Sequence, residues 1–497
     1  MMMKKILVIL CLLGCISGFQ MVQAQDKTLS LDQTIALACD SSLSAFSARN
    51  TFLSSYWAFR SYRAARLPSL SLSMTPLRYN RAFTSRYDYQ TNQDIYRQQQ
   101  QLYSYGNLAV AQNFDLTGGT FYLDSELGYL KNFGANNYQE FSSVPVRLGY
   151  SQDLLGYNSF KWEKRIEPLK YERAKKKLLY NLEEISETVA GFFFSLAMAQ
   201  VQYDLAKAGL TSSDTLYRIG VERQKIASIS QADLLTLKLD RVNAGNTLRN
   251  AEMGLKKAMF SLVTYLNMDK KASVRLELPD RPGKMEITAE DALLQVRRNN
   301  PDFLTNRQSL LEAEKSVERT TRSSKMDASL NLSIGFNQAA SSLKNSYLNP
   351  LEQDVVALSV NIPLIDWGVR KGQVNMARND LNVTKLAVQQ DELSLEEEIL
   401  ITVNDFSVQQ DLINSAEEAR SLADLAYEAT KERYLIGKAD ISSLTLALNR
   451  QESARRNYIS ALQNYWLSYF KIRKLTLYDF ERNLPLSADF ENRYGIH

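Results

Sequence analysis

The side chains that most often carry out catalysis or hold metal ions are scarce in this chain. Its only histidine is the last of the 497 residues, His497, and its three cysteines are Cys11, Cys15 and Cys39. A Ser-His-Asp site needs an internal histidine, and a Cys/His metal site needs several such ligands brought together by the fold. The sequence therefore excludes histidine-based catalysis and Cys/His metal binding.

Carboxylates are the remaining chemical groups. Runs of glutamate stand at residues 183–184 and 396–398, but neither run has a basic or nucleophilic partner at a spacing suited to catalysis. We expect both runs to lie on exposed helix faces. The chain also has no phosphate-binding glycine loop and no nucleophile elbow. We therefore predict a protein that is not an enzyme and that uses no cofactor and no metal.

The charge balance argues against a nucleic-acid partner. The chain has 59 Lys and Arg against 55 Asp and Glu, a net charge of +4. A dedicated nucleic-acid-binding protein has a larger basic excess.

The amino terminus has the features of an export signal. Lys4 and Lys5 precede an apolar run over residues 6–16, and Ala24 ends a short segment suited to cleavage. We expect a signal peptide over residues 1–24. Residues 12–15 also resemble a lipobox, in which Cys15 would carry lipid, and this alternative stays open.

No later segment has 18 consecutive apolar residues, so we expect no membrane-spanning helix.

Internal repetition organises the rest of the chain. An offset of 210 residues aligns residues 154–260 with residues 364–470 and pairs Asp214 with Asp424. A second offset, of 258 residues, relates the segments that precede these two, so the first copy contains an insertion. We predict a first repeat over 25–269, a linker over 270–285, a second repeat over 286–478 and a C-terminal tail over 479–497.

Each repeat is predicted to contain an opening helix, a set of strands and a long helical hairpin. Heptad-spaced residues predict one opening helix across residues 31–59. Residues 369–433 contain no proline and a single glycine, Gly372. A continuous helix of this length would be a rod of about 100 Å.

Apolar and polar residues alternate in the segments between the helices. Such alternation occurs over residues 330–336 and 356–362 in the second repeat, and over 70–74 and 144–150 in the first. The insertion, near residues 108–135, contains a hairpin signal at Thr117-Gly118-Gly119. Strands with one apolar face suit a membrane wall. Because four strands cannot close a barrel, the pattern requires several chains.

This arrangement resembles the TolC-type outer-membrane efflux proteins. Its strongest local cues are residues 66–70 (Arg-Leu-Pro-Ser-Leu), where a helix enters a strand, and residues 362–368 (Ile-Pro-Leu-Ile-Asp-Trp-Gly), where a strand enters a long helix. The resemblance implies a mainly α fold with membrane β-structure, built from two tandem repeats. In a homotrimer, four strands per chain would form a twelve-stranded β-barrel, continued by a long α-helical coiled-coil tunnel. The extra hairpin of the first repeat departs from this pattern, and it either is extracellular or stiffens the barrel rim.

The resemblance also implies a function. The protein would be an outer-membrane channel with a long periplasmic portion, a passive exit duct for substrates delivered by an inner-membrane pump and a periplasmic adaptor. Efflux and type I secretion both use such a duct. The alternative is a periplasmic coiled-coil scaffold or adhesin without a pore, which leaves the one-sidedly apolar strands without a purpose.

Family members bind the adaptor at the turns of the long hairpins and close the tunnel nearby. Together with the offset of 210, the resemblance implies two docking tips, at Ile226, Ala227 and Ser228 and at Ile436, Gly437 and Lys438. Glycine suits a helix end, as at Gly437, whereas Ala227 stands where glycine is expected in the first repeat. The gate zone implied by the resemblance consists of Tyr434, Asp440 and Asp233.

Basic residues cluster where the helices are expected to meet the strands. In the implied topology they lie near the periplasmic leaflet, where outer-membrane lipid phosphates attract cations. The alternative is that they merely coat exposed helix faces. This basic belt consists of Arg63, Arg66, Lys161, Lys164, Arg165, Arg322, Arg370 and Lys371.

Overall fold

The computed structural model describes residues 27–133, 137–226, 229–270, 272–280, 283–436 and 438–490. The predicted signal peptide and the lipidation alternative at Cys15 lie outside these residues. The chain divides into two compact units, and both repeats contribute to each. Among the described residues, the sheet unit comprises those within 52–175 and 301–394, and the helical unit those within 27–51, 176–300 and 395–490.

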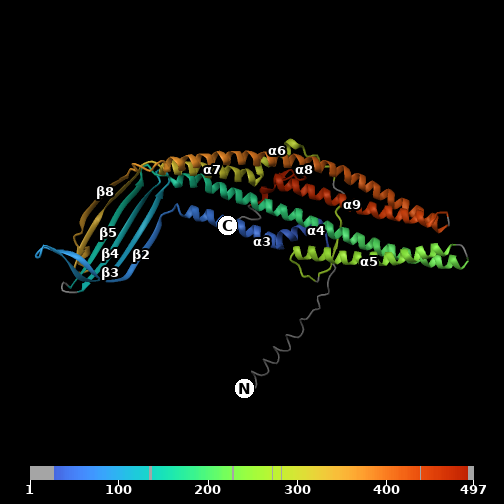
Figure 1. The fold of residues 1–497 in the computed structure, drawn as a ribbon, viewed down its shortest axis with the longest axis horizontal. Coiled ribbons are helices and arrows are strands. Elements are labelled where there is room, and N and C mark those ends of the chain that lie inside the picture. Colours follow the sequence, from blue (N-terminus) through green and yellow to red (C-terminus); the bar gives the residue numbers. More distant parts are fainter. Residues whose placement is uncertain are drawn as a thin grey trace, which may run out of the picture. The chain divides into compact units, whose positions relative to one another are not determined.

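Six strands of the sheet unit form one antiparallel sheet (Figure 1). Their order is β2-β3-β4-β5-β7-β8, so β2 and β8 are its edges. A short 3-10 helix, η1 (Asn345–Tyr347), connects the last two. The strands are β2 (Ser69–Asp88), β3 (Gln93–Phe114), β4 (Gly119–Phe133), β5 (Tyr138–Asp153), β7 (Asp327–Ala340) and β8 (Leu351–Asn361).

Helices flank the strands in the same order in both halves of the chain, as the predicted tandem repeats require. The first half has α2 (Leu31–Ser41), α3 (Leu43–Ala64), α4 (Ser159–Lys225) and α5 (Gln231–Tyr265). The second half has α6 (Ala289–Asn299), α7 (Pro301–Ser323), α8 (Val369–Leu435) and α9 (Ile441–Thr476). Helices α4 and α8 have 67 residues each, which confirms the long uninterrupted helix expected from residue 369 onward. No described helix is both long enough and apolar enough to cross a membrane.

The opening helix of each repeat is broken, so the single helix predicted over residues 31–59 is wrong. Ser42 has an extended backbone, and its hydroxyl accepts a hydrogen bond from the Ala45 N–H at 3.1 Å, which starts the new helix α3. In the second repeat Asn300 is extended and Pro301 begins α7, a position where the missing N–H of proline costs nothing.

Two small sheets belong to the helical unit. Strand β1 (Lys27–Leu29) pairs in parallel with β6 (Val274–Leu276), which lies in the predicted linker. In the tail, β9 (Tyr478–Asp479) pairs with β10 (Leu484–Pro485), and the 3-10 helix η2 (Leu486–Asp489) follows.

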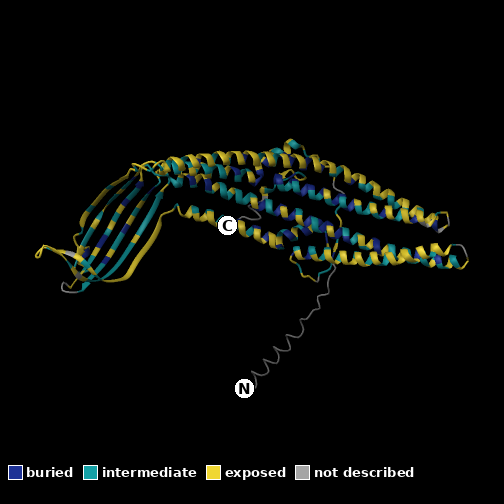
Figure 2. Ribbon diagram, in the orientation of Figure 1, coloured by how far each residue is buried: buried dark blue, intermediate teal, exposed yellow. Residues whose placement is uncertain are grey.

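The core of the helical unit is aromatic and contains an ion pair. Phe193, Phe406 and Tyr465 are fully buried, and Figure 2 shows buried residues along α4 and α9. The Arg473 guanidinium contacts the Glu183 carboxylate, with Nη2 and Oε1 3.0 Å apart. Burial raises the pKa of Glu183, while the charge of Arg473 opposes that rise. The expectation that Glu183 is exposed is therefore wrong. Its partner Arg473 lies 290 residues away in the sequence, so the local pattern around Glu183 does not indicate this buried pair.

Candidate functional site: the sheet wall and the hairpin tips

One face of the six-stranded sheet is apolar and exposed. The strand registers align Leu70, Val110, Leu123, Leu148 and Ile334 in a single row across five strands. Four of these side chains are among the exposed large hydrophobic residues, Leu70 at 69% and Ile334 at 60%. Soluble monomers rarely expose contiguous apolar patches of this kind. The row therefore marks a face that meets an apolar environment.

The opposite face is polar. The next row crosses all six strands and contains small or hydrophilic residues, namely Ser71, Ala109, Asp124, Arg147, Gly335 and Gln353. An apolar outer face with a polar inner face is the pattern of an outer-membrane barrel wall.

The alternation in β5 reverses at a bulge. A register shift between Ser143 and Arg147 accommodates Pro145, so Val144 faces the same side as Arg147 while Val146 stays on the apolar face. The prediction that residues 144–150 alternate without interruption is therefore wrong at Val144, which is 9% exposed.

An ion-pair cluster on the polar face was not predicted. Arg147 of β5 donates to Asp124 of β4, with Nε and Oδ1 3.0 Å apart, and also contacts Glu126. The Asn107 amide of β3 donates to both carboxylates, at 3.0 and 3.1 Å. Charged residues inside an alternating segment are the only sequence signal for this cluster, and the partners become visible only once the strand register is known.

The extra hairpin lies within the sheet. Strands β3 and β4 are the predicted insertion, and Gly118 has a φ of +81° in the predicted Thr-Gly-Gly turn. The four expected strands are present as β2, β5, β7 and β8, but β3 and β4 stand between β2 and β5 in the ladder. The sheet of each chain therefore has six strands where four were expected, because the hairpin hydrogen-bonds to strands on both of its sides.

The basic belt lies at one end of the strands, where α3 leads to β2, β5 to α4, α7 to β7 and β8 to α8. Four members have partners. Arg66 donates to the Phe160 carbonyl at 3.0 Å and pairs with Asp115 at 3.3 Å. Arg165 stacks on Trp162, while Arg322 and Arg370 pair with acidic residues of their own segments.

The other four belt members are exposed. Within the described residues none of them forms an ion pair, so these cations are free to meet a phosphate. They are Arg63, Lys161, Lys164 and Lys371.

The second hairpin tip contains an ordered helix end. The Ile436 N–H donates to the Glu432 carbonyl and the Lys438 N–H donates to the Arg433 carbonyl, at 3.2 and 2.8 Å. The latter bond spans five residues, the pattern of a Schellman motif, which favours glycine at the position before its donor. Ile436 is 67% exposed and its counterpart Ile226 is 76% exposed. The predicted docking residues Gly437, Ala227 and Ser228 lie outside the described residues.

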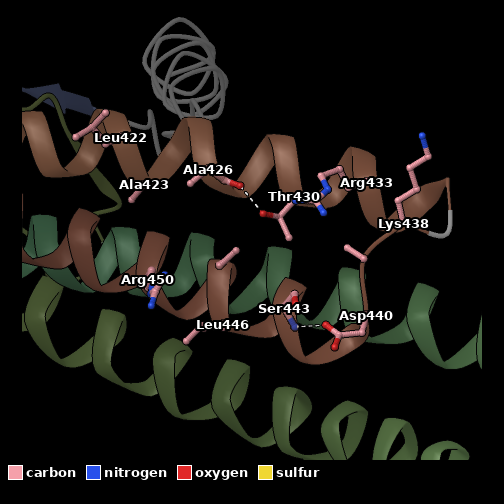
Figure 3. Close-up of a pocket in the computed structure, with 12 residues that line it drawn as sticks. Leu422, Ala423, Ala426, Thr430, Arg433, Lys438, Asp440, Ser443, Leu446 and Arg450 are labelled. Atoms are coloured by element: carbon pink, nitrogen blue, oxygen red, sulfur yellow. Dashed lines mark hydrogen bonds between the residues drawn. The ribbon is translucent and has the colours of Figure 1, made fainter.

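A groove of about 880 Å³ lies between α8 and α9 at this tip (Figure 3). Its apolar lining comes from Leu422 and Ala426 of α8 and Leu446 of α9, and its charged lining includes Lys438 and Asp440.

The predicted gate residues have separate partners. Tyr434 is buried, 5% exposed, and the Arg223 guanidinium of α4 lies 5.8 Å from its ring centre. Asp440 caps α9 by accepting the Ser443 N–H at 2.8 Å, the dashed line in Figure 3. Among the described residues no hydrogen bond or ion pair joins Tyr434, Asp440 and Asp233 to one another.

Asp233 completes a capping box. Its carboxylate accepts the Ser230 N–H at 3.1 Å, and its own N–H donates to the Ser230 hydroxyl at 3.1 Å. These hydrogen bonds hold the pKa of Asp233 below its usual value, and the bond from Ser443 does the same for Asp440. Both residues therefore have a structural role in starting a helix.

Comparisons with known proteins agree with this architecture. Residues 292–476 match the family model of the outer membrane efflux protein. The matched segment runs from within α6 to the end of α9, and over it the chain is similar to this family. Among solved structures, this chain is similar to outer membrane channels. No curated protein sequence matches it significantly.

Solved outer-membrane channels share the fold. The CmeC channel of Campylobacter jejuni has a TM-score of 0.66 at 15% identity, and covers 93% of this chain and 88% of its own. The open state of MtrE from Neisseria gonorrhoeae has a TM-score of 0.61 at 15% identity, covering 90% and 88%. VceC of Vibrio cholerae has a TM-score of 0.57 at 16% identity, covering 90% and 95%. The predicted fold class, a mainly α channel with membrane β-structure and tandem halves, is confirmed apart from the number of strands.

Proposed function

We propose that this protein is a passive exit duct for efflux in the outer membrane. Three copies form the duct, and an inner-membrane pump delivers substrate with the help of a periplasmic adaptor. The observation that carries this proposal is the two-faced sheet, with the row of Leu70, Leu123 and Leu148 exposed on one side and polar residues on the other. Such a sheet has a use only where lipid lies outside and water inside.

The absence of a catalytic constellation fits a duct. The described residues contain no group of three or more potential metal ligands, and carboxylates such as Asp440 and Glu183 serve in a helix cap and an ion pair. A passive duct needs no site that couples an energy source to transport, because its partners supply the energy and select the substrate.

The adaptor would dock at the two hairpin tips. Ile226 and Ile436 occupy equivalent positions in the two repeats, and each exposes an apolar side chain beside a helix end. Exposed, equivalent apolar side chains at both tips suit an apolar contact made repeatedly around a trimer.

The free cations of the belt, such as Lys164 and Lys371, would contact lipid phosphates at the inner leaflet.

Tip docking can be tested with paired variants. We expect Ile226→Asp with Ile436→Asp to abolish efflux of a fluorescent substrate from cells lacking the native gene, because a carboxylate opposes an apolar contact. The conservative pair, Ile226→Val with Ile436→Val, should retain efflux. Both proteins should give the same amount of trimer in the outer membrane. Normal efflux by the Asp pair at normal trimer levels would remove the docking role.

A further inference from the structure

The six-stranded sheet implies a wider barrel than four strands per chain would give. We propose that three copies close one barrel of eighteen strands, in which β8 of each copy pairs with β2 of the next. This inference rests on the proposed trimeric channel and adds the composition of its wall.

The inserted hairpin is a full part of the wall. On one side β3 pairs with β2 from Ala111 opposite Ser69 to Gln93 opposite Asp88. On the other side β4 pairs with β5 from Thr120 opposite Ser151 to Asn132 opposite Tyr138. Removing the hairpin from the wall would break both ladders, and unpaired backbone groups in a membrane are strongly unfavourable.

The side chains of the hairpin match those of its neighbours on both faces. Val110 and Leu123 continue the apolar row between Leu70 of β2 and Leu148 of β5. A hairpin that stood above the membrane would have no need for apolar residues at this level of the ladder. The lipid-facing band therefore runs through the insertion.

Charge pairing anchors the hairpin on the polar face. The Asp124 side chain is 4% exposed and pairs with Arg147, which belongs to β5. A buried carboxylate without a partner is strongly unfavourable, so the inserted β4 and the neighbouring β5 are stable only together. At the turn of the hairpin, Asp115 pairs with Arg66 at 3.3 Å, and its carbonyl accepts the Asn158 amide at 3.0 Å.

The two edges of the sheet fit a second copy of the same chain. Consecutive strands are antiparallel, so the first and last of six run in opposite directions. Strand β8 of one copy can therefore continue the ladder onto β2 of another without reversing it. Both edges also expose matching apolar residues on the outer face, Leu70, Leu72 and Met74 on β2 and Val356, Leu358 and Val360 on β8.

A closed ring of strands leaves no strand edge unpaired, which a membrane requires. An even number of strands per chain keeps every neighbouring pair antiparallel around that ring. Barrel diameter grows roughly linearly with strand number, so eighteen strands give a barrel about 1.5 times as wide as twelve. The wall would then admit bulky solutes, and any size limit would lie in the helical portion.

Electron cryo-microscopy of the detergent-extracted particle tests this inference, because the strands can be counted in cross-section. We expect three copies and eighteen strands. A matched variant that lacks residues 93–133 joins β2 to β5 by a short loop and should give a twelve-stranded wall, with Arg147→Gln added to remove the unpaired charge.

Cysteine pairs in intact membranes give an independent measurement. In a Cys39→Ser background, Leu72→Cys with Leu108→Cys should form a disulfide, as should Leu123→Cys with Leu148→Cys, because each pair lies opposite in the ladder. Disulfides in both pairs place the hairpin between β2 and β5.

The outcomes are distinct. A trimer with twelve wall strands, or a dimer that closes twelve strands from six per copy, would overturn the eighteen-stranded barrel and leave a channel. A soluble monomer would overturn the channel itself.

Discussion

Asp233 and Asp440 start the two return helices from opposite positions of the same four-residue motif. In the first repeat Ser230 is the N-cap and Asp233 is the third helical residue, whereas in the second repeat Asp440 is the N-cap and Ser443 is the third. Each hairpin thus retains one serine and one carboxylate with their order reversed. A carboxylate at a helix N-terminus is favourable there because of the unpaired N–H groups and the helix dipole.

Substitutions at Asp440 separate capping from charge. Asparagine is as good an N-cap as aspartate, whereas alanine is not. We expect Asp440→Ala to increase amide hydrogen exchange in the first turn of α9 and Asp440→Asn to leave it unchanged. If these carboxylates also form the proposed gate, Asp233→Asn with Asp440→Asn should raise the resting conductance. Unchanged conductance in that double variant would leave the residues with capping alone.

The lowered pKa values fix the direction of the pH effect. A group whose pKa is lowered by folding stabilises the fold above its unfolded pKa of about 4, and this contribution is lost as the pH falls through the folded value. Both caps should therefore stay charged at neutral pH. We expect exchange in the first turns of α5 and α9, corrected for intrinsic rate, to be constant from pH 8 to pH 5.

Tyr434 is expected to hold α8 against α4 through its ring. Its side chain is buried and lies under the Arg223 guanidinium, so the ring matters more than the hydroxyl. Tyr434→Phe should keep the resting conductance of the wild type, whereas Tyr434→Ala removes about 3 kcal/mol of packing and should raise it. Single-channel recording in planar bilayers distinguishes the two. Equal conductance of the alanine and phenylalanine variants would argue against a role for this contact in closure.

Arg147 should be essential for the stability of the sheet. Its replacement by methionine leaves the buried Asp124 without a cationic partner, with only the Asn107 amide still donating to it, at a cost of about 3 kcal/mol. We expect the Arg147→Met trimer to dissociate at a lower temperature in detergent than the wild type. Arg147→Met combined with Asp124→Asn and Glu126→Gln removes the unpaired charges and should recover part of the loss. No recovery would show that the arginine acts by packing instead of charge.

Cys39 should be inert in the folded protein. Burial raises the pKa of its thiol to about 11, and its Sγ lies 3.9 Å from both the Leu182 carbonyl and the Ser186 hydroxyl. The reactive thiolate is therefore scarce at neutral pH. We expect no maleimide labelling at pH 7.5 in the native protein and full labelling after denaturation. Rapid labelling of the native trimer would contradict this packing.

The long elements were predictable because they depend on local sequence. An apolar alternation identified four of the six strand regions by its period, and the absence of proline and of all but one glycine identified α8. The Thr117-Gly118-Gly119 turn located the extra hairpin for the same reason.

The contacts between residues far apart in the sequence were not predictable. The pairing of Glu183 with Arg473, and of Arg147 with Asp124, depends on helix packing and strand register, which periodicity does not determine. The break at Ser42 was missed because a heptad pattern continues through it, although the hydroxyl can begin a new helix. The place of the hairpin within the wall likewise requires knowledge of both of its neighbours.

We propose above that this protein works as an oligomeric channel in the outer membrane. The most direct measurement is the intact mass, by native mass spectrometry, of the particle extracted from the outer-membrane fraction with mild detergent. We expect three copies of the chain that co-fractionate with the outer membrane. A monomer recovered from the soluble periplasmic fraction would contradict it.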